Sequence, residues 1–277
     1  MSWRRGRIAA LCLTTLLTTA RAGPQPLWEF GMGVGGVVFD DYRGSSTAHG
    51  YPVPVPYFIY RGDILQADRN GVHGRFLTLL HLEFDVSANA TAPVFSRHNA
   101  ARAGMPNLAP TIELGPSLTW HAWRSADQRL RFDVHAPIRN AITVDTPVRS
   151  IGWLFSPTAN LDYTASGRLS GWNFGLQSGP LYQQEQYDNY FYGVAPQYQT
   201  AIRPVYRPPG GYAGAQLLVA ASKRYRDYWV GAYLRHDWLS GAVFDPSPLV
   251  QTHGYWAGGV GFVWIIRSSA TMVASDE

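Results

Sequence analysis

The sequence predicts an all-β protein, and more specifically a transmembrane antiparallel up-and-down β-barrel. Three observations predict this fold: the composition, long segments in which polar and apolar residues alternate, and the alternation of short and long joints between those segments. Of the 277 residues, 14% are aromatic and 15% are charged, with 28 Gly and 19 Pro. Such a chain is too aromatic to be disordered and too rich in helix-breaking residues for a helical bundle.

Alternation of polar and apolar residues identifies the individual strands. Residues 81–91, 111–122 and 129–139 alternate strictly, which is typical of strands with one wet and one apolar face. Looser alternation continues over residues 28–39, 53–60, 151–162, 172–177, 213–223, 227–239 and 254–266. Most of these segments are longer than the globular average of about 5–6 residues, and most of them reach the roughly 9–11 residues that a tilted strand needs to cross a bilayer. Their length therefore favours a membrane barrel over a secreted β-sandwich.

The joints between the strands predict which end of the barrel faces which compartment. Short joints at 124–128, 164–170 and 224–226 alternate with long ones at 40–51, 92–110, 183–211 and 240–253. Outer-membrane barrels have short periplasmic turns and longer extracellular loops. Tryptophans near the expected strand ends fit interfacial girdles: Trp28, Trp120, Trp153, Trp172, Trp256 and Trp264.

The number of strands depends on residues 53–77. Prolines 54 and 56 predict a local distortion of the strand at 53–60. Residues 64–68 and 72–77 form a candidate hairpin around Asn70-Gly71, a type I′ turn signal. The hairpin gives 12 strands, the count we favour, and its absence gives 10; both are even, as this topology requires.

The two ends of the chain lie outside the predicted barrel, which covers residues 23–266. Residues 1–22 are predicted to be an export signal, because a basic start and an apolar segment precede Ala20-Arg21-Ala22. Residues 267–277 form a polar tail that we expect to be disordered. The formal charge of +4 comes from four arginines in the signal, and without it bases and acids balance. A nucleic-acid partner is therefore not expected, and the single Cys12 leaves the exported protein without a thiol or disulfide.

Several short motifs resemble those of the MipA/OmpV family of Gram-negative outer-membrane proteins. The motifs occur in order along nearly the whole exported chain: Asp41-Tyr42-Arg43-Gly44-Ser45, Pro56-Tyr57-Phe58-Ile59-Tyr60-Arg61-Gly62-Asp63, Ala103-Gly104-Met105-Pro106, Ile112-Glu113-Leu114-Gly115-Pro116-Ser117, Asp188-Asn189-Tyr190-Phe191-Tyr192-Gly193-Val194, Leu239-Ser240-Gly241-Ala242-Val243-Phe244 and Ser247-Pro248-Leu249-Val250. No single motif decides the resemblance, which rests on their order and spacing.

The resemblance implies an outer-membrane location and, as a function, a scaffold that links a membrane-bound lytic transglycosylase to a murein synthase at the periplasmic face. It implies neither catalytic residues nor a cofactor. The expected surroundings are outer-membrane lipid and lipopolysaccharide, reached through the barrel-assembly machinery, since residues 261–266 resemble its C-terminal signal. Two alternatives remain open: a pore or small-solute channel, and a surface adhesin acting through the long loops.

Alternation also predicts a polar network inside the barrel. Seven charged side chains should face the lumen from neighbouring strands: Glu83, Asp85, Glu113, Arg129, Arg131, Asp133 and Arg139. Such a set either neutralises itself and fills the lumen or lines a selective pore. His81 and His121 are also expected in the lumen, where they fit general polar lining better than a metal site.

Two further groups are candidates for interactions at the ends of the barrel. The candidate docking residues on periplasmic turns are Arg61, Asp63, Arg124, Asp127, Arg168, Arg224 and Arg226. The candidate recognition residues in the 183–211 loop are Tyr187, Tyr190, Phe191 and Tyr192. The alternative for these aromatics is a self-packed loop that covers the barrel mouth. A nucleophile elbow of the G-x-S-x-G type is absent from the sequence, and we expect no enzyme activity.

Overall fold

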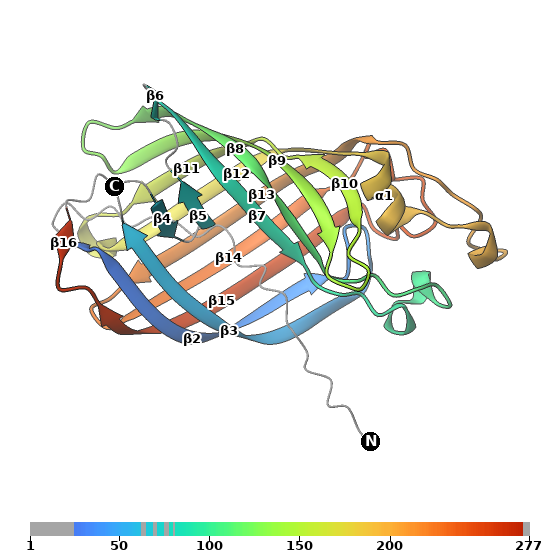
Figure 1. Ribbon diagram of the computed structural model, residues 1–277, viewed down its shortest axis with the longest axis horizontal. Helices are drawn as coiled ribbons and strands as arrows, with labels where there is room; N and C mark the ends of the chain where they lie inside the picture. Colours follow the sequence, from blue (N-terminus) through green and yellow to red (C-terminus); the bar gives the residue numbers. More distant parts are fainter. Residues whose placement is uncertain (1–24, 62–64, 69–70, 75–77, 80, 274–277) are drawn as a thin grey trace, which may run out of the picture.

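The protein is a long β-barrel made of one antiparallel sheet (Figure 1). The computed structural model describes residues 25–61, 65–68, 71–74, 78–79 and 81–273, and the predicted export signal lies outside them. The long strands are β2 (Trp28–Asp40), β3 (Ala48–Arg61), β7 (Leu82–Thr91), β8 (Thr111–Arg124), β9 (Leu130–Thr143), β12 (Trp172–Gln183), β13 (Gly211–Arg224), β14 (Tyr228–Trp238) and β15 (Gly254–Ser268). The predicted all-β barrel class is confirmed.

One strand position is shared by two shorter pieces. β10 (Ser150–Phe155) and β11 (Thr158–Thr164) both pair with β9 and with β12. They are separated by Ser156 and Pro157, and proline interrupts a ladder because it has no N–H to donate. The two pieces therefore act as one broken strand.

The predicted hairpin is present as a short element between β3 and β7. Its strands are β4 (Leu65–Asp68) and β5 (Gly71–Gly74), and β6 (Thr78–Leu79) follows. β4 pairs with the end of β3. On the other side, β5 contacts β7, and β6 pairs with β7. Counting β10 with β11, and β5 with β6, gives the described sheet twelve positions, which agrees with the larger predicted strand number.

Three prolines lie along β3 without distorting it, so the predicted distortion is wrong. Every residue of β3 from Ala48 to Tyr60 pairs in register with β2, past Pro52, Pro54 and Pro56. Because that ladder is unbroken, the nitrogens of the three prolines must lie on the opposite edge of β3. In the described residues, that edge pairs with β4 only at Tyr60 and Arg61. The prolines thus occupy an edge on which few donors are needed.

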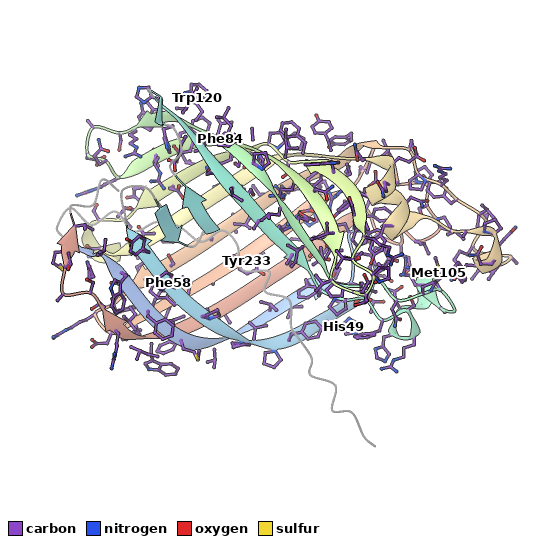
Figure 2. The ribbon with its side chains drawn as sticks, viewed as in Figure 1. His49, Phe58, Phe84, Met105, Trp120 and Tyr233 are labelled. Atoms are coloured by element: carbon purple, nitrogen blue, oxygen red, sulfur yellow. The ribbon has the colours of Figure 1, made fainter. Side chains whose placement is uncertain are left out.

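The two faces of the wall separate apolar from polar residues. On β2 and β8, outward positions such as Met32, Val34 and Leu114 are more than half exposed, while the residues between them are buried. Phe58 and Trp120, which are labelled in Figure 2, are also about half exposed. The wall therefore presents an apolar surface where lipid would lie.

Tryptophans mark both ends of this apolar band. Trp153, Trp238 and Trp256 are exposed near the long loops, whereas Trp120, Trp123 and Trp264 are exposed near the short turns. Trp256 and Trp264 lie on one strand, eight positions apart. At ~3.3 Å per residue they are separated by ~26 Å along the strand, which at a tilt of about 40° spans ~20 Å of height, most of the apolar band of about 25 Å expected for such barrels.

The ends of the barrel differ in construction (Figure 1). The long loops gather at one end and carry α1 (Glu185–Tyr192) and the 3₁₀ turns η1 (Ser96–His98), η2 (Ala100–Arg102) and η4 (Pro196–Tyr198). The short turns, with η3 (Gly167–Leu169), lie at the other end. The described residues contain no helix that is long and apolar enough to cross a bilayer.

The C-terminal tail is more ordered than the sequence predicts. Arg267 and Ser268 continue β15, and β16 (Met272–Val273) pairs with β1 (Gln25–Pro26). The expectation of disorder is therefore wrong for residues 267–273, because backbone pairing with the first described residues holds them. Residues 274–277 lie outside the described part of the chain.

A close approach at the break between β10 and β11 gives a test of the fold. A Cβ atom added to Gly179 would lie 1.9 Å from the carbonyl oxygen of Pro157, whereas a Cβ on Gly36 would meet no heavy atom within 4 Å. Gly179→Ala must displace backbone, so we expect it to destabilise the barrel by about 1–3 kcal/mol. The fraction of heat-modifiable folded protein after refolding in detergent, across a urea series, measures this.

The matched control is Gly36→Ala, which adds the same methyl group to an open position on β2. We expect its urea midpoint to equal or exceed that of the wild type, since alanine restricts the unfolded chain. Equal midpoints for the two variants would contradict the packing described at Pro157.

Candidate functional site

The inner wall of the barrel is mostly apolar on one side, apart from ion pairs such as Arg224–Glu29 and Arg235–Asp237, and mostly polar on the other. Inward side chains of β2, β3, β13, β14 and β15 form one buried apolar cluster: Val37, Val53, Val55, Tyr57, Ile59, Ala220, Trp229 and Val263. Inward side chains of β7, β8, β9 and β11 are instead mostly charged or polar. The candidate network lies on this polar half, so its charges face one side of the lumen.

His121 on β8 is the centre of a network near the short-turn end. Its Nδ1 lies 2.9 Å from Asp133 on β9 and its Nε2 lies 3.2 Å from Glu83 on β7. Arg131 contacts the same Asp133 at 3.0 Å and reaches Asp162 on β11 at 3.2 Å. Four neighbouring strand positions are thus joined by side chains of both signs, which compensates the cost of burying each charge.

A second group, nearer the long loops, joins the wall to the mouth of the barrel. Glu113 is only 2% exposed; Arg139 lies 3.3 Å from it, and Asn89 donates to it. The hydroxyl of Tyr187, on α1, donates to the other oxygen of Glu113 at 2.9 Å. Arg139 also donates to hydroxyls on both sides, at Ser87 and Ser156. The carboxylate of Glu113 therefore pairs with Arg139 in the wall and also accepts a hydrogen bond from α1 in the loop.

The structure brings most of the predicted lumen residues together but separates one. Asp85 accepts from the hydroxyl of Thr119 at 3.0 Å, beside the two groups above. Arg129 lies in the turn after β8 and is 3.8 Å from the exposed Asp127, so it is outside the network.

His81 is exposed in a turn, and His121 has carboxylate partners. Among the described residues, no group of three or more His, Cys, Asp or Glu is arranged to hold a metal ion.

Sequence reasoning missed several members of these groups. Asp162 was assigned to a strand but not to the network, and the aromatic Tyr187 was not linked to Glu113. The alternation that places Asp133 inward also places Asp162 inward, so the first omission could have been avoided. The link from Tyr187 to Glu113 joins residues 74 positions apart, and no sequence spacing indicates it.

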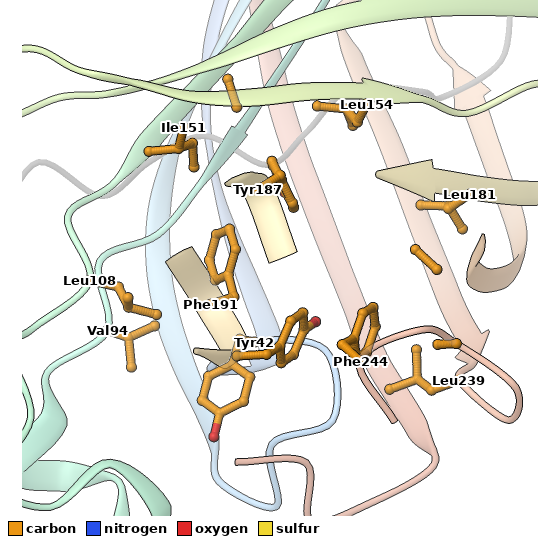
Figure 3. Packing of buried hydrophobic residues seen from close by; sticks show 14 residues of the cluster. Tyr42, Val94, Leu108, Ile151, Leu154, Leu181, Tyr187, Phe191, Leu239 and Phe244 are labelled. Atoms are coloured by element: carbon orange, nitrogen blue, oxygen red, sulfur yellow. The ribbon is translucent and has the colours of Figure 1, made fainter. Parts of the chain in front are cut away.

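The mouth of the barrel is packed by an apolar cluster, here called the mouth cluster (Figure 3). It combines side chains from the long loops, α1 and the neighbouring strand ends: Tyr42, Val94, Leu108, Ala141, Ile151, Leu154, Leu181, Tyr187, Phe191, Tyr192, Ala213, Leu239, Ala242 and Phe244. The rings of Tyr192 and Phe244 stack with centroids 3.8 Å apart. These contacts join loops that lie far apart in the sequence, and they hold the loops against one another.

This cluster corrects the recognition hypothesis for the 183–211 loop. Tyr187, Phe191 and Tyr192 are buried, with exposures of 7%, 7% and 2%, because they pack against the other loops. Tyr190 is half-buried and bonds to the backbone of Ala109. These four aromatics therefore fit the self-packed alternative and are not available as an exposed recognition surface.

Polar groups fix the same loops to the wall. Arg43, in the loop after β2, contacts Asp237 on β14 at 2.7 Å and donates to the carbonyl of Ala213 on β13. Asp237 also pairs with Arg235. Arg102 donates to the carbonyl of Phe191, at the end of the helix. The cluster is therefore held by hydrogen bonds to charged groups as well as by apolar packing.

One carboxylate beside the mouth cluster has no hydrogen-bond partner in the described structure. Asp188 on α1 is fully buried, and neither of its carboxylate oxygens accepts a hydrogen bond in the described structure. The charge that favours its ionised form is that of Arg43, one of whose terminal nitrogens is also without a partner in the described structure. Burial raises the pKa of Asp188 to about 8, and the attraction of Arg43 opposes that shift only in part. The helix therefore packs best with Asp188 protonated.

Four of the seven predicted docking residues are exposed at the short-turn end. Arg124, Asp127, Arg168 and Arg226 are exposed there. Arg224 instead points inward, where it contacts the buried Glu29 at 3.2 Å, so it is not a docking residue. Arg61 ends β3, and Asp63 lies outside the described residues.

Comparison with known proteins identifies the family. The family described as MltA-interacting protein MipA matches residues 32–266, which is most of the barrel. The chain belongs to the MipA family. Family membership, together with the apolar outer face and its tryptophan belts, makes it an outer-membrane β-barrel protein.

Similarities to solved structures are weaker. The NanC porin is 8% identical, with a TM-score of 0.39, over 85% of this chain and 100% of that one. OprG from Pseudomonas aeruginosa is 9% identical, with a TM-score of 0.25, over 87% of this chain and 94% of that one. These values are too low to say anything about transport by this chain. No curated protein sequence matches it.

The buried Asp188 predicts that the mouth loosens as the pH rises. Its carboxyl binds a proton more tightly in the packed loop than in an unpacked one, so packing is most stable near pH 4 and loses stability up to about pH 8. We expect cleavage of the 184–210 loop by a protease active throughout this range to be several-fold faster at pH 8.5 than at pH 5. Asp188→Asn keeps the shape without the charge and should make cleavage independent of pH.

The matched control is Asp245→Asn, which removes a partly exposed carboxylate from another loop at the same end. It should retain the pH dependence of the wild type. Equal cleavage of the wild type at both pH values, or the same dependence in Asp188→Asn, would show that Asp188 does not govern loop packing.

Proposed function

We propose that this MipA-family barrel is a non-enzymatic scaffold that binds a lytic transglycosylase, and through it a murein synthase, at the periplasmic side of the outer membrane. The family match over residues 32–266 is the observation that carries the proposal, because the family is described by its interaction with MltA. The barrel would serve as an anchor that holds the cell-wall enzymes beside the membrane.

The construction of the mouth supports a scaffold over the two alternatives. A channel needs a continuous water-filled path, whereas here the long loops pack against one another in the mouth cluster. An adhesin acting through the 183–211 loop needs exposed anchors, whereas three of its four candidate aromatics are buried. The packing of the long loops and the burial of their aromatic side chains are both explained if the loops close the barrel.

The short-turn end offers the surface for docking. Arg124, Arg168 and Arg226 are exposed on neighbouring turns, and Asp127 adds one acid. The turn at residues 125–129 is held in shape, since Asp127 accepts from the hydroxyl of Ser125 at 2.6 Å and from the backbone N–H of Arg129. An ordered rim with an excess of arginine suits a partner surface rich in carboxylates.

Binding to a purified lytic transglycosylase of the MltA type tests the proposal directly. We expect the detergent-solubilised barrel to bind it reversibly. Arg124→Glu and Arg168→Glu should each weaken binding by about two- to fivefold. Most of this loss should come from a slower association rate, which depends on the salt concentration. Surface plasmon resonance at two salt concentrations measures both effects.

Arg97→Glu is the control for charge reversal, because Arg97 is exposed in η1 at the opposite end of the barrel. Its binding should equal that of the wild type. A wild-type barrel that binds neither transglycosylase nor murein synthase would remove the scaffold function, and equal weakening by Arg97→Glu would remove the proposed docking surface.

The packed mouth also predicts the electrical behaviour of the barrel. In planar bilayers we expect no steady conductance from the wild type. A variant in which residues 185–209 are replaced by a short Gly-Ser linker should conduct, because it lacks α1 and its part of the mouth cluster. Steady open channels in the wild type would favour the channel alternative.

A further inference from the structure

Aromatic side chains form a connected row on the outer face of the barrel near the short turns. Trp172 and Phe174 stack on β12, and the rings of Tyr225 and Tyr228 stack 4.4 Å apart at the start of β14. Tyr228 then contacts Phe262 on β15, which contacts Trp264 at 4.4 Å. The row lies at the level where the apolar band ends, where amphipathic rings meet lipid headgroups.

Lys223, the only lysine in the sequence, bridges the gap in this row. It lies opposite Trp172 in the β12–β13 ladder, and its ammonium is 6.0 Å from the Trp172 ring and 5.2 Å from the Tyr225 ring. A Cβ on Gly171 would lie 3.4 Å from its Cε, so the lysine stem lies against a residue without a side chain. Among the described residues, no carboxylate lies within 4 Å of this ammonium.

The turn beside Lys223 is fixed by hydrogen bonds. The N–H of Tyr225 donates to the carbonyl of Tyr228, and Arg224, which is anchored by Glu29, donates to the carbonyl of Arg226. Arg226 is exposed at the tip of this turn, and Arg168 is exposed on the next turn of the rim. Asp227 is the one acid in the 225–227 turn. Lys223 and Arg226 are therefore two cations beside one held turn, which carries a single acid.

We propose that Lys223, Arg226 and the rings of Trp172 and Tyr225 form a binding site for the headgroup of an anionic glycerophospholipid in the periplasmic leaflet. The phosphate would meet the two cations, and the acyl chains would lie along the rings of Tyr228, Phe262 and Trp264. Cations beside a membrane surface attract anionic headgroups, and lysine can snorkel from an aromatic belt to reach them.

The direction of the side chains favours lipid over a soluble partner. Lys223, Trp172, Tyr228 and Trp264 lie on the outward side of their strands, as do the neighbouring apolar residues, while the alternate residues Ser222, Trp229 and Val263 are buried within the barrel. A periplasmic protein would approach along the barrel axis, whereas this row faces sideways into the bilayer. The inference does not depend on the scaffold function.

Native mass spectrometry of the full-length exported protein, released from detergent with defined lipid, tests the site. The probes are phosphatidylglycerol and phosphatidylethanolamine of identical acyl chains at equal concentration. We expect the wild type to retain phosphatidylglycerol preferentially. Lys223→Gln and Arg226→Gln should each reduce that preference by about fivefold, and Lys223→Arg should preserve it.

Arg97→Gln is the matched control, because it removes one exposed cation from the opposite end. It should leave the preference unchanged, and each variant is first shown to be folded by its heat-modifiable migration. The proposal is overturned if the wild type retains the two lipids equally, if Lys223→Gln and Arg226→Gln both keep the preference, or if Arg97→Gln loses as much of it.

Discussion

The structure depends on one constraint: within a bilayer the backbone N–H and C=O groups have no water to bond, so a sheet must close on itself. The ladder runs from β3 through β15 and β9 to β7, with one break between β10 and β11, and the short β4–β5 hairpin lies between its two ends. In the described residues, the edge of β3 pairs with β4 at only two residues. Three prolines place their nitrogens on this edge, which removes donors that would otherwise lack partners.

Closure also imposes the chemistry of the interior. A barrel wall has one inner side chain at every second position, and these must either pack or neutralise one another. Here the half formed by β2, β3 and β13–β15 packs apolar side chains, with Trp229 lying close to Gly231. The half formed by β7–β9 and β11 pairs Arg131 and His121 with carboxylates. Both solutions avoid an uncompensated charge, and neither requires a transported solute to explain it.

How far the sequence predicts this molecule depends on the range of the interaction. Alternation from Arg129 to Arg139 is a local property, so it predicted the strand, its inner face and the candidate network. It could not predict that Arg129 leaves the network, because the ladder between β8 and β9 shifts register near Trp123 and the turn follows directly. The mouth cluster was equally inaccessible, since it joins residues from Tyr42 to Phe244 through loops that have no periodicity.

The two ends of the barrel differ in how they treat polar and aromatic side chains, several of which are buried at the mouth, whereas arginines are exposed at the short turns. This difference is the main structural argument about function. At the mouth, buried side chains from separate loops bond to one another, and even a carboxylate, Asp188, is enclosed without a hydrogen-bond partner. At the short-turn end, Arg124, Arg168 and Arg226 are exposed, whereas Arg224 pairs inward with Glu29. A group kept free at the surface can bind something else, whereas a buried group can only stabilise. This difference supports the proposal that the short-turn end is the surface for interaction.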